Sequence, residues 1–231
     1  MNRKIWFVFT CFALLVSSYI VVQYFIMDGF QTGLVKVKLM FGSKLSAFWY
    51  MMLFIHITTS IVALVIGPFT LSTKFRERNI NRHRIAGRIY MVGILLGGVS
   101  GLYLSFYATG GLVAKLGFGL LSVFWLTSAY QALHRVKNKK IKEHRNWMIR
   151  NYALTFAAVT LRIWLPLFIV LFGIEQFELS YAIIAWLAWV PNLIVAELFI
   201  RKRLNKGKYE GNEDLHFCCK IAVILRTKIF K

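Results

Sequence analysis

Six long apolar runs constrain this 231-residue chain more than any other feature of its sequence. Each has close to the ~20 residues that a helix needs to cross a hydrocarbon core of about 30 Å. A backbone in lipid must satisfy its own hydrogen bonds, and the runs are too long and too continuously apolar for barrel strands, so each is predicted to be a helix. The predicted spans are residues 5–25, 45–71, 89–109, 116–133, 151–173 and 179–200.

The composition supports a lipid environment and argues against a nucleic-acid partner. The chain is 58% hydrophobic and only 16% charged, whereas soluble domains are about half apolar and a quarter charged. Its formal net charge of +20 would suggest nucleic-acid binding in a soluble protein. Here the cations lie in short segments between apolar runs, which is typical of topology signals. The predicted fold class is therefore an all-α, polytopic transmembrane helix bundle.

The distribution of Lys and Arg predicts the orientation of this bundle. Two lie at the amino end, six in residues 73–88, seven in residues 134–150 and nine after residue 200, whereas the opposite loops hold Lys36, Lys38, Lys44 and Lys115. Short basic loops stay in the cytoplasm, so both termini are predicted there, in a multi-pass protein of the cell membrane. Its partner is the bilayer, with the basic segments at the anionic inner leaflet. The predicted organisation is a first helix and outer loop (1–44), a five-helix core (45–200) and a basic cytoplasmic tail (201–231).

Two histidines at the basic ends of predicted helices suggest a cofactor site. A bis-histidine haem between helices needs one imidazole from each of two facing helices at equal depth, and His83 and His144 meet this requirement. They predict one b-type haem, with Arg88 and Arg150 available to hold its propionates. The alternative is that these residues, and His134 above all, are interfacial anchors that bond lipid phosphates or backbone carbonyls.

Ionisable residues inside predicted spans suggest a second site. His56 lies about nine residues, or roughly 13 Å, into the second span, and Arg162 in the fifth span and Trp125 in the fourth reach a matching depth. Intramembrane charge is expensive and by default functional, and no acid lies at this depth to pair with Arg162. The three residues predict an outer-half cavity for an anionic or lipid-like molecule. The alternative is ordinary packing of Trp125 and an arginine that extends to the interface.

A row of small residues predicts close helix packing. Gly93, Gly97 and Gly101 recur at four-residue spacing on one face of the third span, which indicates a close neighbouring helix. A structural subunit that packs through this face, including a homo-oligomer, is a third hypothesis. No glycine-rich phosphate loop, haem-attachment motif, HExxH pair or nucleophile elbow occurs, so whether the protein is an enzyme stays open.

Four segments resemble a known family. They are His56 with Gly67-Pro68-Phe69, then residues 83–90 (HRIAGRIY), residues 97–104, and residues 144–155 continuing to Leu161-Arg162. They are similar to the bacterial membrane-protein family catalogued as domain of unknown function 2306. The resemblance implies a multi-helix membrane protein and assigns no reaction.

A more distant resemblance, to cytochrome b561 and related dihaem membrane cytochromes, rests on histidines in the second, third and fifth helices. It implies an inner haem held by His83 and His144. His56 has no histidine partner in the outer half of the fourth helix, because His134 lies at the other end, so at most one haem is implied. A reduced-minus-oxidised absorbance spectrum separates this redox hypothesis from the ligand cavity around His56 and Arg162.

Overall fold

The computed structural model describes residues 3–27, 33–40 and 45–205, and this part of the chain is built of helices without a strand. The chain divides into two compact units, residues 1–193 and 194–231. Residues 190–205 are helical, and most of the predicted cytoplasmic tail lies outside the described residues. The predicted domain limits at residues 44 and 200 stay predictions.

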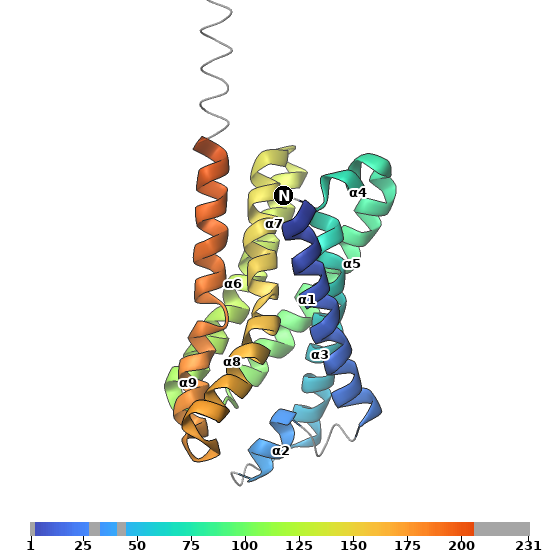
Figure 1. Cartoon of the computed structure of the whole chain (residues 1–231). Helices are drawn as coiled ribbons and strands as arrows, with labels where there is room; N and C mark the ends of the chain where they lie inside the picture. Colours follow the sequence, from blue (N-terminus) through green and yellow to red (C-terminus); the bar gives the residue numbers. More distant parts are fainter. Residues whose placement is uncertain (1–2, 28–32, 41–44, 206–231) are drawn as a thin grey trace, which may run out of the picture. The chain divides into compact units, whose positions relative to one another are not determined.

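The helices of the first unit follow one another with short connections (Figure 1). They are α1 (Arg3–Val21) with a π-helical turn (Val22–Ile26), α2 (Gly33–Met40), α3 (Ala47–Leu71), α4 (Thr73–Arg78), α5 (Ile80–Ser105), α6 (Gly111–Lys137), α7 (Ile141–Thr155), α8 (Ala157–Phe172), a 3₁₀ turn (Ile174–Gln176) and α9 (Phe177–Leu187).

Six helical segments of the described chain are long and apolar enough to cross a membrane, which confirms the predicted all-α bundle of six spans. They are Trp6–Ile26, Ala47–Leu71, Ile80–Ser105, Gly111–Lys137, Ile141–Phe172 and Ile174–Asn205. The fourth has 27 residues rather than the predicted 18, because Lys115 interrupts the apolar run near its start and basic residues follow Leu133 at its end. The protein is therefore a multi-pass protein embedded in a lipid bilayer.

The basic segments of the first unit gather at one end of the bundle. The Trp6 indole N–H donates to the Pro68 carbonyl (2.8 Å), so the start of α1 lies beside the end of α3. Figure 1 shows α4 and the start of α7 at this end and α2 at the opposite end. Residues 73–88 and 134–150, which carry thirteen Lys and Arg, thus share one end. That this end faces the cytoplasm, and that the membrane is the cell membrane, stay predictions.

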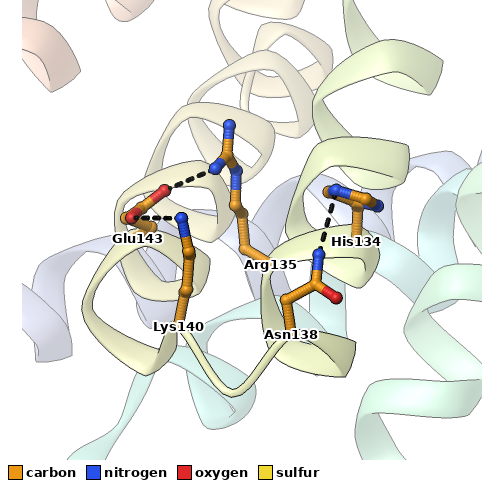
Figure 2. A network of polar contacts seen from close by, with 5 residues as sticks. All are labelled: His134, Arg135, Asn138, Lys140 and Glu143. Carbon is orange, nitrogen blue, oxygen red and sulfur yellow. Dashed lines mark hydrogen bonds and ion pairs between the residues drawn. The ribbon is translucent and has the colours of Figure 1, made fainter.

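The turn between α6 and α7, at the basic end, carries a small polar network (Figure 2). Glu143 forms an ion pair with Arg135 (2.8 Å) and a longer one with Lys140 (3.7 Å). The side-chain amide nitrogen of Asn138 lies within hydrogen-bond distance (3.0 Å) of Nε2 of His134, and His134 is exposed. His134 therefore points away from the bundle interior.

The glycine face of α5 packs against α3 of the same chain. A Cβ at Gly93 would lie 3.1 Å from the Thr59 carbonyl oxygen, and one at Gly97 would lie 3.0 Å from the Thr59 hydroxyl. Small residues at this spacing let two backbones approach closely. The neighbour predicted from the sequence is thus an internal one, and this face is not open to a partner chain. A homo-oligomer stays a prediction.

A buried hydrogen-bond network joins α5, α6 and α7. The Tyr90 hydroxyl donates to Asn151 Oδ1 (2.7 Å), and the Asn151 amide donates to the Trp125 carbonyl and to Ser128 Oγ, both at 2.8 Å. The Trp125 indole N–H donates to Thr155 Oγ1 (2.9 Å). Unpaired polar groups in a membrane interior are costly. This network therefore lets polar side chains hold three helices together.

Candidate functional site

A cavity of about 210 Å³ lies in the half of the bundle away from the basic end. Its wall is formed by the ends of α1, α2 and α5, by residues 49–64 of α3, by the first half of α6, by the α7–α8 junction with the start of α8, and by Tyr181 of α9. A cavity of this size is far larger than the ~15 Å³ that one water needs. His56, Trp125 and Arg162, which the sequence places at matching depth, all line it.

His56 sits in the cavity wall because Gly101 of α5 leaves room for its ring. Its Nδ1 lies 2.7 Å from the Gly97 carbonyl oxygen. A carbonyl only accepts, so Nδ1 carries the proton and Nε2 of the neutral ring keeps a lone pair. A Cβ at Gly101 would lie 2.9 Å from Cε1 of His56. Gly101 therefore accommodates the histidine, whereas Gly93 and Gly97 lie against Thr59 of α3.

Arg162 brings a positive charge to the cavity, and no carboxylate of the described residues pairs with it. Its Nη1 donates to the Ala158 carbonyl (2.9 Å), one turn earlier in α8. A guanidinium carries five N–H donors, and within the described chain Ala158 is the acceptor that the structure pairs with it. The remaining donors are available to a ligand in the cavity.

Trp125 belongs to the apolar wall rather than to the polar set. Its single N–H is already donated to Thr155, and an indole has no other donor. Its side chain is 6% exposed and forms part of the largest core cluster. Trp125 thus offers a ligand an apolar surface, consistent with the packing role that the sequence left open.

Lys38 is a cavity residue that the sequence did not reveal. It lies on α2, is only 4% exposed and lines the cavity. Its ammonium donates to the Tyr107 carbonyl and to Thr109 Oγ1 (3.1 Å), and it lies 5.9 Å from the centroid of the Trp49 ring. Burial, and to a smaller extent the nearby charge of Lys115, lower the pKa of Lys38 to about 8. The sequence around Lys38 is typical of a loop and carries no signal of this burial.

The cavity is consequently cationic. Arg162 and Lys38 line it beside the neutral His56, and no lining residue in the described chain is an Asp or Glu. Hydroxyl groups add further donors, including Ser60 Oγ, which is buried and has no hydrogen-bond partner in the part of the chain that the structure describes. The rest of the wall is mostly apolar, with side chains such as Leu53, Ile61 and Leu121. Such a cavity suits a molecule with an anionic group and an apolar part.

His83 and His144 meet at the other end of the bundle, where both line a second pocket. Its volume of about 40 Å³ is far below the ~300 Å³ at which cofactor pockets begin, so a haem does not fit between these histidines as they stand. The two predicted propionate partners lie elsewhere: Arg88 is exposed, and Arg150 stacks on Trp147 at 4.8 Å. The arrangement of these residues gives no support to haem binding, which rests on the sequence prediction alone.

Comparison with known proteins assigns the family. No curated protein and no solved structure matches the chain. The sequence model of the family described as "Predicted membrane protein (DUF2306)" matches residues 53–200. This range includes His56, Trp125 and Arg162 but not Lys38. Because the match extends over more than half of the chain, the protein belongs to the membrane-protein family known as domain of unknown function 2306.

Proposed function

We propose that this protein binds an anionic, lipid-like small molecule in the cavity around His56 and Arg162, and that it senses or moves this molecule rather than transforming it. One observation carries the proposal. A buried lysine and an intramembrane arginine face the same cavity, which has no carboxylate among its described lining residues.

Energetics favour an anionic ligand. Charges in a low-dielectric interior are costly unless they are paired, and a carboxylate or phosphate in the cavity would offset this cost by pairing with a cation of its wall. The apolar wall accommodates a hydrocarbon segment, and the volume of about 210 Å³ limits the enclosed part to a headgroup and a short chain. A nucleophile, a metal cluster or an acid–base pair is not needed for this role.

Substitution of Arg162 by leucine tests the proposal. Octanoate serves as the anionic probe and octanol as its uncharged counterpart, with the full chain in lipid nanodiscs and binding measured by calorimetry. We expect Arg162→Leu to weaken octanoate binding about tenfold or more, since a charge-assisted hydrogen bond is lost, and to leave octanol binding unchanged. Arg84→Leu removes an exposed arginine outside the cavity and is the matched control. Octanoate binding of wild-type strength in Arg162→Leu would refute the proposal.

The lowered pKa of Lys38 predicts a pH dependence of binding. Lys38 is charged at pH 7 and loses its proton as the pH rises through about 8, whereas the guanidinium of Arg162 stays charged. Octanoate affinity should therefore fall about fivefold or more between pH 7 and pH 9.5. A bound anion favours the charged ammonium, so the midpoint should lie above that of the free protein.

Two variants separate Lys38 from the other groups around the cavity. Lys38→Met should bind octanoate weakly at pH 7 and show little further decline. Lys36→Met removes an exposed lysine of the same helix and should keep the wild-type profile. The neighbouring Lys115 and the cavity tyrosines, Tyr24 and Tyr181, remain present in both variants. A pH profile in Lys38→Met that matches the wild type would show that another group titrates.

A further inference from the structure

The small pocket at the basic end lies where three parts of the chain converge. It is lined by residues 70–73 at the end of α3 and the start of α4, by Arg76 of α4, by His83 of α5, and by His144 and Arg145 of α7. Its volume is about 40 Å³, and it is independent of the cavity around His56.

Imidazole groups with unused hydrogen-bonding capacity face this pocket. Nδ1 of His83 is buried and has no hydrogen-bond partner among the described residues. His144 uses its Nδ1, which lies 2.8 Å from the Ala132 carbonyl. Because that carbonyl only accepts, Nδ1 of His144 carries a proton, and Nε2 donates to an anionic partner when the ring is the imidazolium. Buried polar atoms normally have a partner, and the orphaned His83 nitrogen is positioned to bond to a ligand in the pocket.

The charges around the pocket identify the kind of ligand. Arg76 and Arg145 add two guanidinium groups to the two imidazoles, and no carboxylate lines the pocket in the described chain. The acid next to Arg76 is Glu77, whose contact is long (3.9 Å) and exposed. Positive charges that line one small pocket repel one another, and a bound anion relieves this repulsion. Planar guanidinium groups are well suited to the oxygens of a phosphate.

The size of the pocket limits which anions it can hold. A volume of about 40 Å³ corresponds to roughly two to four waters, at ~15 Å³ or less each, which matches one tetrahedral oxyanion. A macrocycle is too large. A phosphodiester must leave the pocket by two ester arms, whereas a terminal phosphate has one arm or none.

We propose that this pocket binds a terminal phosphate group, held by Arg76, His83, His144 and Arg145. The group is either inorganic phosphate or the phosphomonoester headgroup of a lipid such as phosphatidic acid. In either form the anion joins α4, α5 and α7 at the basic end of the bundle, and it does so without any role for the cavity around His56.

Calorimetry with inorganic phosphate, at constant ionic strength and with the full chain in detergent, tests the site. Arg76→Gln should lower phosphate affinity about tenfold, because one charge-assisted contact is lost. Arg84→Gln makes the same charge change at an exposed residue one position from His83 that does not line the pocket, and it should leave affinity unchanged. His83→Gln, which removes the orphaned imidazole, should also weaken binding. Arg76 is on a short, partly exposed helix, so Arg76→Gln keeps the test valid if His83→Gln does not fold.

Nanodiscs then distinguish the two sources of phosphate. Phosphatidylcholine discs that contain either phosphatidic acid or the diester phosphatidylglycerol are compared by the thermal unfolding midpoint. A higher midpoint with phosphatidic acid, lost in Arg76→Gln, identifies a lipid headgroup. Phosphate binding in detergent with equal midpoints in both discs identifies a soluble phosphate. Equal losses of affinity in Arg76→Gln and Arg84→Gln, or neither phosphate binding nor a preference for phosphatidic acid, would overturn the proposal.

Discussion

Replacement of Gly67 by alanine is expected to lower the free energy of unfolding by about 3 kcal/mol, near the upper end of overpacking costs. A Cβ at Gly67 would lie 2.2 Å from Cε2 and 2.3 Å from Cδ2 of Tyr152, well inside van der Waals contact. The ring cannot move away easily, because it is buried and its hydroxyl donates to the Leu64 carbonyl (3.3 Å). Either the ring or the backbone of α3 must shift, and we expect the loss as a lower denaturation midpoint in detergent.

A matched control and a double variant test this explanation. Gly87, a glycine in α5, has no atom within 4 Å of its Cβ position, so Gly87→Ala should be neutral or stabilise the helix by up to about 1 kcal/mol. Tyr152→Leu removes the ring, so its combination with Gly67→Ala should cost less than the sum of the single changes. Strict additivity of the two changes would show that the ring contact is not the cause.

Asn151→Asp is expected to destabilise the protein by about 3 kcal/mol or more. The two side chains have nearly the same shape, but aspartate has no amide to donate to the Trp125 carbonyl and to Ser128. In the ionised form it would place an oxygen close to the Trp125 carbonyl oxygen, in a site that is fully buried. An unpaired buried charge costs roughly 3–5 kcal/mol. Equilibrium unfolding of the purified protein measures the change.

The same substitution at an exposed position is the control. Asn138 lies in the α6–α7 turn and is exposed, with several lysines nearby in the sequence, so Asn138→Asp should change stability by less than about 0.5 kcal/mol. Similar losses at both positions would mean that the network around Asn151 does not contribute to stability.

The sites differ in how far the sequence predicted them. Counting residues from the ends of the spans, at about 1.5 Å per residue, predicted that His56, Trp125 and Arg162 lie at the same depth in the membrane. All three line one cavity. Lys38 could not be predicted as their neighbour, because its burial depends on how α2 packs against the ends of α3 and α5. His83 and His144 were expected to face each other, but the space between them depends on the packing of α3, α4 and α7, which no residue spacing reports.

The sequence by itself determined the six membrane helices and their apolar limits, because a lipid interior accepts only backbones that satisfy their own hydrogen bonds. It also indicated that α5 has a close neighbour through its glycines. Only the tertiary structure decided that this neighbour is α3, that Tyr152 fills the space above Gly67, and that Lys38 joins Arg162 at one cavity. The reason is that burial and charge pairing depend on side chains from distant segments, whereas span length and periodicity are properties of each segment alone.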